Sequence, residues 1–225
     1  MRKQANGYLQ RRKQLSTAMT CWLLGCFLLI SACSFSQSED QQAPAKAPLD
    51  PKKVLIVYLS RTNNTKAVAN MIHRAMGGTL VALELEQPYP ANYQATVQQV
   101  ARENEAGYLP PLHTKIANLQ QYDVVFIGFP TWGMQLPPPI KSFLNEVDLS
   151  GKTLVPFNSN AGYGVGSSFA TVKALAPKST ILEGFSTRGG IERDGVLFVM
   201  EGTKEKQVQT EVYAWLKRIN LLGTK

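Results

Sequence analysis

Cysteine is scarce in this 225-residue chain, and the three that occur, Cys21, Cys26 and Cys33, all precede residue 34. We therefore expect neither a disulfide nor thiol chemistry in the remainder of the chain. Histidine is equally rare: His73 and His113 are the only two, and neither has the spacing of a metal-ligand motif. The scarcity argues against metal, thiol and Ser–His mechanisms, so any redox chemistry has to come from a bound cofactor.

Acidic residues are missing from the first 32 positions, which hold five of the 24 Lys and Arg residues. The rest of the chain has 19 basic and 16 acidic residues, so it contributes only three of the formal net charge of +8. Binding to nucleic acid requires clustered cations that neutralise phosphates. The charge pattern therefore predicts no nucleic-acid partner.

The N-terminal region also lacks an apolar run long enough to cross a bilayer. Its uncharged apolar stretch, residues 21–30, has about ten residues, whereas a hydrocarbon core of ~30 Å needs about 20 in a helix. A short apolar stretch after basic residues is typical of a signal peptide. The sequence thus predicts export.

The end of this stretch, Ile-Ser-Ala-Cys at residues 30–33, resembles the lipobox of bacterial lipoproteins. The resemblance implies that residues 1–32 are a signal peptide and that Cys33 becomes the acylated first residue; an ordinary signal peptide is the alternative. Residues 33–51, rich in Ser, Gln, Ala and Pro, predict a flexible tether. The expected location is extracytoplasmic, with the protein lipid-anchored on the periplasmic side of a bacterial membrane. Ser34, in place of Asp, indicates the outer membrane.

From residue 53 onward, short apolar runs alternate with helical patterns. Residues 54–59 form a continuous apolar, β-branched run, typical of a strand buried on both faces. The alternation predicts strands at 54–59, 79–85, 122–128, 152–157 and 179–186, and helices at 65–77, 91–105, 139–146, 167–176 and 204–219. Such an order predicts a three-layer α/β/α sandwich with a five-stranded parallel sheet over residues 52–222. Residues 195–200 are apolar enough to predict an extra edge strand.

Three unusual loops follow strands of this sheet, at the ends where ligands bind in open parallel sheets. The first precedes a helix and is rich in hydroxyls and amides, a composition that suits an anion at a helix N-terminus but also suits a simple cap. It lacks the Gly-Lys-Ser/Thr ending of a nucleoside-triphosphate loop. Its residues are Ser60, Arg61, Thr62, Asn63, Asn64 and Thr65.

The second loop contains Pro130, Thr131, Trp132 and Gly133. A tryptophan near a strand end either packs in the core or presents its face to a flat ligand. The third loop is rich in glycine, which lets the backbone approach a ligand closely, although a mobile loop with an exposed Tyr is the alternative. Its candidate residues are Asn160, Ala161, Gly162, Tyr163 and Gly164.

Together the three loops resemble those of the flavodoxin family, over about residues 52–220. The first loop is similar to the family's Ser-x-Thr-Gly-Asn-Thr, with Asn63 where Gly is usual, and Asn tolerates positive φ. Thr131-Trp132-Gly133 is similar to the loop whose aromatic ring stacks on the flavin. The resemblance implies a flavodoxin-like fold and an FMN cofactor. In that fold the first loop holds the phosphate, Trp132 and Tyr163 cover the ring, and N–H groups of the third loop meet its pyrimidine edge.

Three functions are consistent with these residues. The favoured one is an FMN-binding electron-transfer protein, exchanging electrons with a redox partner protein or a small-molecule acceptor. An FMN-dependent reductase of quinones or other small molecules, using NAD(P)H, is the first alternative. It requires a substrate pocket, which residues 86–121 would supply with Tyr89, Tyr93, Tyr108 and His113. The second alternative is a flavin-free binding module on the same fold.

Overall fold

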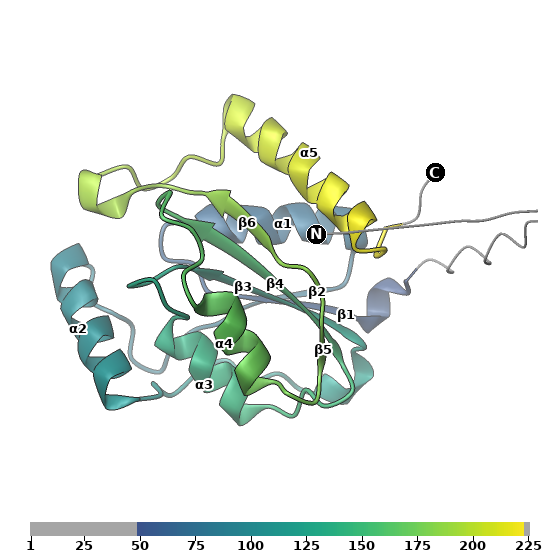
Figure 1. Cartoon of the computed structure of the whole chain (residues 1–225), viewed down its shortest axis with the longest axis horizontal. Coiled ribbons are helices and arrows are strands. Elements are labelled where there is room, and N and C mark those ends of the chain that lie inside the picture. Colours follow the sequence, from purple (N-terminus) through teal and green to yellow (C-terminus); the bar gives the residue numbers. More distant parts are fainter. Residues whose placement is uncertain (1–48, 223–225) are drawn as a thin grey trace, which may run out of the picture. The chain divides into compact units, whose positions relative to one another are not determined.

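The computed structural model describes residues 49–222, which contain the α/β/α sandwich predicted from the sequence (Figure 1). All strands pair in parallel, in the order β2-β1-β3-β4-β5, and β6 also pairs with β4. The strands are β1 (Val54–Tyr58), β2 (Thr79–Ala82), β3 (Val124–Pro130), β4 (Thr153–Asn160), β5 (Thr180–Ile181) and β6 (Phe185–Arg188). The helices are α1 (Asn64–Met76), α2 (Tyr93–Ala106), α3 (Pro138–Glu146), α4 (Ser168–Leu175) and α5 (Gly202–Arg218). The flavodoxin-like fold is confirmed.

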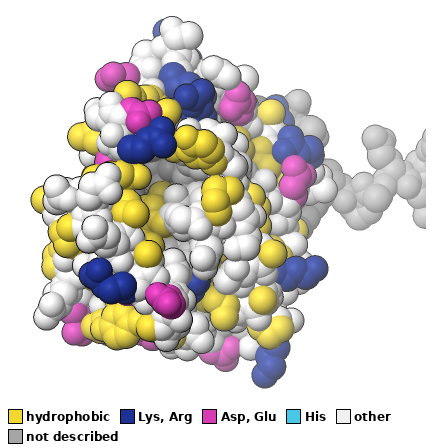
Figure 2. Space-filling model, turned by 60° about the vertical axis from the view of Figure 1, so that its left-hand side comes forward, with side chains coloured by type: hydrophobic (Ala, Val, Ile, Leu, Met, Phe, Trp, Pro, Cys, Tyr) yellow, Lys and Arg dark blue, Asp and Glu magenta, His cyan; other side chains and the backbone are white. Residues whose placement is uncertain are grey.

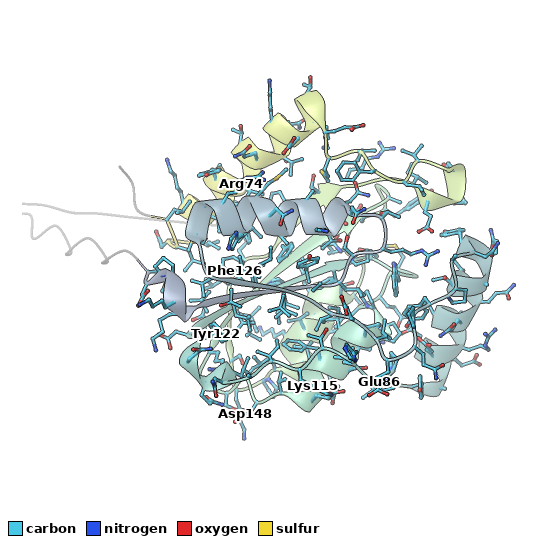
Figure 3. All side chains as sticks on the ribbon, turned by 180° about the vertical axis from the view of Figure 1, so that it is seen from behind. Arg74, Glu86, Lys115, Tyr122, Phe126 and Asp148 are labelled. Carbon is cyan, nitrogen blue, oxygen red and sulfur yellow. The ribbon has the colours of Figure 1, made fainter. Side chains whose placement is uncertain are left out.

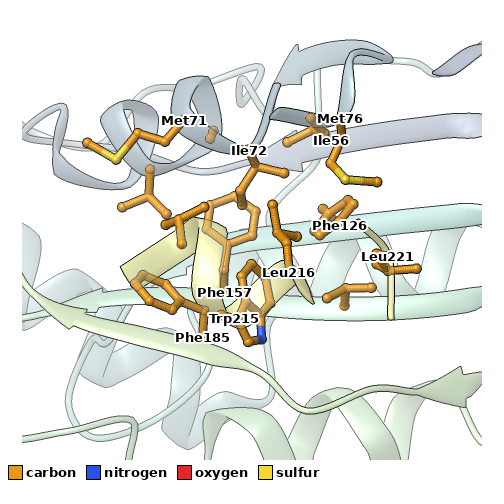
Figure 4. Close-up of a cluster of buried hydrophobic side chains, with 14 of the residues drawn as sticks. Ile56, Met71, Ile72, Met76, Phe126, Phe157, Phe185, Trp215, Leu216 and Leu221 are labelled. Carbon is orange, nitrogen blue, oxygen red and sulfur yellow. The ribbon is translucent and has the colours of Figure 1, made fainter. Parts of the chain in front are cut away.

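Two apolar layers hold the sheet between its helices. Every residue of β1 is buried, as expected for a central parallel strand. On one face, under α1 and α5, Phe126, Phe157 and Trp215 pack together (Figure 4). On the other face Tyr122 and Ile127 pack with residues of α3 and α4. Figure 3, seen from behind, shows Phe126 on the α1 side of the sheet and Tyr122 on the opposite side.

The predicted fifth strand, 179–186, is in fact interrupted. β5 pairs with the start of β4 and β6 with its end, so both extend the same edge of the sheet. Between them the carbonyl of Glu183 accepts a hydrogen bond of 2.9 Å from the Trp215 indole N–H. Leu154 lies opposite Ile181 and Phe157 opposite Phe185, so the three residues 182–184 face only two residues of β4, and this extra residue interrupts the strand.

The prediction of an edge strand at residues 195–200 is wrong. The sheet does have a sixth strand, but it is β6, and residues 195–200 form a loop. The backbone of this loop pairs with the side chain of Asn64, which donates to the Leu197 carbonyl at 2.6 Å and accepts from the Val199 N–H at 3.1 Å. The partner of these backbone groups is therefore the amide side chain of Asn64 and not a neighbouring strand.

Two features of the topology determine where a ligand can bind. The chain moves from β1 to β2 on one side and then to β3 on the other, so the strand order reverses between β1 and β3. Such a reversal opens a crevice at the carboxyl ends of the two strands. α2 lies beside this end of the sheet rather than over either face (Figure 1). A hydrogen bond of 2.8 Å from Lys141 Nζ on α3 to Asn104 Oδ1 ties it down.

Within residues 49–222, no helix is long and apolar enough to cross a membrane. Cys33, the predicted signal peptide and most of the predicted tether lie outside the described residues.

Candidate functional site

A cavity of about 490 Å³ opens where β1, β3 and β4 end. The hollow lies on the face shown in Figure 2, with apolar side chains on its rim and charged ones next to it. Ten of the residues predicted in the three loops line it: Arg61, Thr62, Asn64, Thr65, Pro130, Thr131, Trp132, Gly133, Asn160 and Ala161. The structure thus brings the three predicted loops together around one space.

The first loop presents unpaired donors to this space. Asn63, directly before α1, has φ 62° and ψ −3°, the left-handed conformation that Asn tolerates, and its side chain does not cap the helix. The first N–H groups of a helix have no partner within it, and together with the helix dipole they favour an anion. The Thr62 hydroxyl accepts from Asn64 Nδ2 at 2.9 Å, which leaves its own hydrogen free. The buried hydroxyls of Thr65 and Ser159 share one hydrogen bond of 2.8 Å, so one further hydrogen is available there.

Two members of the first loop have structural contacts instead. Ser60 does not line the cavity, and its hydroxyl accepts from the Lys66 N–H at 3.2 Å, so it caps α1. Arg61 lines the cavity, but its guanidinium pairs with Glu192 at 2.7 Å and donates to the carbonyls of Pro90 and Ala91. Arg61 therefore joins three segments of the chain.

The second loop is a tight hairpin that holds Trp132 at the cavity. The N–H groups of Trp132 and Gln135 each bond to the other's carbonyl, at 3.3 and 3.0 Å. The two residues between them, Gly133 and Met134, have φ of 57° and 59°, as in a type I′ turn. Trp132 is half-buried, which places it at the cavity wall rather than in the interior of the core.

Tyr89 fixes the position of the Trp132 ring. The two rings meet edge to face, with centroids 5.2 Å apart and planes at 88°. The Tyr89 hydroxyl in turn donates to the buried carboxyl of Glu103 on α2. Burial, together with this hydrogen bond, raises the pKa of Tyr89 far above that of a free phenol, so the hydroxyl keeps its proton. The indole is thus held by a chain of contacts that ends on α2.

Asn160 organises the third loop. Its side-chain oxygen accepts from the N–H groups of Gly162 and Gly164 at 2.8 and 3.1 Å. Gly162, Tyr163 and Gly164 themselves do not line the cavity, and Tyr163 is 64% exposed. The structure gives no support to Tyr163 as a second stacking face, since its ring projects into solvent.

One wall of the cavity comes from residues 86–121, the segment that the sequence offered for a substrate pocket. Of the four residues named there, Tyr93 lines the space, whereas Tyr89, Tyr108 and His113 do not. The other wall residues of α2 look in the sequence like ordinary helix positions, and only the place of α2 beside the sheet end reveals them. The residues in this wall are Tyr93, Thr96, Val97, Val100, Ala101, Asn104 and Glu105. Gln135, Ser159, Gly189, Gly190 and Glu192 complete the lining.

The lining of the cavity therefore has two chemically different parts. N–H and hydroxyl donors at the start of α1 suit an anion. Trp132 and the apolar side chains of α2 suit a flat ring. A ligand with a phosphate at one end and an aromatic system at the other matches this arrangement.

Comparison with known proteins gives the same assignment. A family model described as flavodoxin matches residues 53–201. A protein described as a flavoprotein, from Bacteroides eggerthii, is 29% identical, with a TM-score of 0.60 over 74% of this chain and 97% of its own. A flavoprotein from Lactobacillus acidophilus, solved in complex with FMN, is 22% identical, with a TM-score of 0.54 over 64% of this chain and 98% of its own. Among curated proteins none matches. With the family model covering most of the chain and the three loops around one cavity, this chain belongs to the flavodoxin family.

Proposed function

We propose that the chain binds one FMN in this cavity and acts in electron transfer. The observation that carries the proposal is the meeting of three separate loops at the carboxyl ends of β1, β3 and β4, with anion donors and an indole in the lining of one cavity. Bound FMN would supply the redox chemistry, because no side chain of the site offers it. The protein's part is to bind the cofactor, orient it and exclude water from one face of its ring.

Each part of the lining has a distinct role in this proposal. The free N–H groups at the start of α1 and the hydroxyls of Thr62 and Thr65 hold the phosphate. Trp132 stacks against the ring, held from behind by Tyr89. The backbone at Asn160 and Ala161 lies at the cavity wall, where its polar groups can meet the edge of the ring.

One observation favours the reductase as a second candidate. α2 adds a continuous wall to the cavity, including Tyr93, Val97 and Val100, which would enclose a small molecule next to the ring. A carrier that passes electrons only to a protein has no need of such a wall. Turnover of quinones with NADH or NADPH by the purified full chain separates the two.

Trp132→Ala tests the position of the ring. We expect the variant to bind FMN more weakly by about 1–3 kcal/mol, because it loses a stacking contact and the burial of a large apolar surface. The measurement is a titration of the apo full chain, followed by quenching of FMN fluorescence. Trp132→Phe is the control and should keep most of the affinity. If Trp132→Ala binds FMN as tightly as the wild type does, the ring stacks elsewhere.

We further propose that Cys33 carries the lipid anchor. Cells fed a labelled fatty acid should incorporate it into the wild type and into Cys26→Ser, since residue 26 lies in the proposed signal peptide. Cys33→Ser should lose all of the label, because several acyl chains on one cysteine supply the anchor. Label retained by Cys33→Ser would place the modification on another residue.

A further inference from the structure

An ion pair lies directly beside the proposed phosphate position. Arg61 Nε and Glu192 Oε1 are 2.7 Å apart, and the two side chains are only 18% and 20% exposed. The remaining nitrogens of Arg61 donate to the carbonyls of Pro90 and Ala91, at 3.0 and 2.8 Å. The guanidinium is therefore shared among three acceptors and is not a free counter-charge for a ligand.

The segment that carries Glu192, residues 189–199, is held tightly over the first loop. Asn64, only 3% exposed, binds its backbone at Leu197 and Val199. Gly190 makes the close fold of the segment feasible, because a Cβ there would lie 2.3 Å from the Val196 carbonyl oxygen. Glu192 is thus fixed in place by the segment as well as by its ion pair.

A second cavity, also of about 490 Å³, lies on the outer side of this ion pair. Arg61, Thr62 and Glu192 line both cavities, which makes the ion pair the partition between them. The outer cavity is otherwise lined by Asn63, Ala91, Leu197 and Phe198, and the last two are exposed apolar side chains. A ligand that extends beyond the phosphate position would have to pass this partition.

We propose that Glu192 makes the site selective for a flavin with a single phosphate, FMN, over one with a pyrophosphate and adenosine, FAD. The inference rests on the proposed FMN site. FAD would place its second phosphate and its adenosine at the partition, where the ion pair blocks the exit. The carboxylate of Glu192 already neutralises the Arg61 guanidinium, so the partition offers the second phosphate of FAD no net positive charge to bind. The single phosphate of FMN ends before the partition.

The test is a titration of the apo full chain with FMN and with FAD, following the quenching of flavin fluorescence. Glu192→Gln removes the charge and keeps the shape, whereas Glu192→Ala also opens the partition. Asp194→Asn is the matched control: it removes the same charge two residues away, and Asp194 lines neither cavity. Thermal unfolding of each variant establishes that it is folded.

The wild type and Asp194→Asn should both prefer FMN to FAD by roughly a hundredfold or more, and Glu192→Gln should reduce this preference by roughly tenfold. Glu192→Ala should reduce it further, because steric closure is lost as well. Equal affinity of the wild type for both flavins, or an unchanged preference in both Glu192 variants, would overturn the inference and leave the FMN site intact. If the wild type bound neither flavin, the proposed function would fail, and the inference with it.

Discussion

Replacing both Thr62 and Thr65 with alanine should weaken FMN binding by several kcal/mol and riboflavin binding far less. Each hydrogen bond to a charged group contributes about 1.5–3 kcal/mol, and riboflavin lacks the phosphate that would receive it. The structure leaves a hydrogen free on Thr62 and another on the Thr65–Ser159 pair, so both positions can donate to an anion.

Titration of both flavins into the wild type and the double variant measures this difference. The matched control is Thr62→Ser with Thr65→Ser, which keeps the hydroxyls and should keep the selectivity for FMN over riboflavin. Equal losses for the two flavins in the alanine variant would mean that these hydroxyls only support the start of α1. The phosphate would then bind elsewhere.

Trp215→Ala should lower the free energy of unfolding by about 3–5 kcal/mol, the range typical of a buried aromatic residue cut back to alanine. Trp215 is 1% exposed and packs against Phe126 and Phe185, with ring centroids at 6.0 and 5.3 Å. Its loss leaves a cavity under α5 and takes away the indole partner of the Glu183 carbonyl.

Urea unfolding of the full chain gives the change in stability. Trp215→Phe, which keeps most of the ring but loses the N–H, should fall between the alanine variant and the wild type. Trp215 lies in the core under α5 and does not line the cavity, so FMN affinity of the folded variant should stay close to that of the wild type. A change of less than 1 kcal/mol on Trp215→Ala would contradict the packing described for this core.

The sequence was sufficient to predict the sheet because buried parallel strands are continuous apolar runs. Val54–Tyr58 and Val124–Pro130 are two such runs, and both lie at the centre of the sheet. The left-handed backbone conformation at Asn63 could also be predicted, because Asn is one of the few residues that adopt positive φ. Both features depend only on the local sequence, which is why they can be predicted from it.

Other features depend on contacts between distant parts of the chain. The pattern of α2 gives a helix with few apolar positions, but not its place beside the sheet end. The apolar residues at 195–200 suggest a strand, but the side chain of Asn64 forms hydrogen bonds with their backbone in place of a neighbouring strand. Glu192 is an ordinary acidic residue in the sequence, and its partner Arg61 lies 131 residues away. Such pairings set the shape of the cavity and cannot be predicted from residues near them in sequence.

The most direct test of the FMN site is the visible spectrum of the purified full chain, with added FMN and with excess ligand then removed. We expect a yellow protein with one FMN per chain, released by acid, whose absorption bleaches on stepwise anaerobic reduction and returns on reoxidation. A folded protein that is colourless and fails to take up added FMN would contradict the account and leave a flavin-free binding module on a flavodoxin fold.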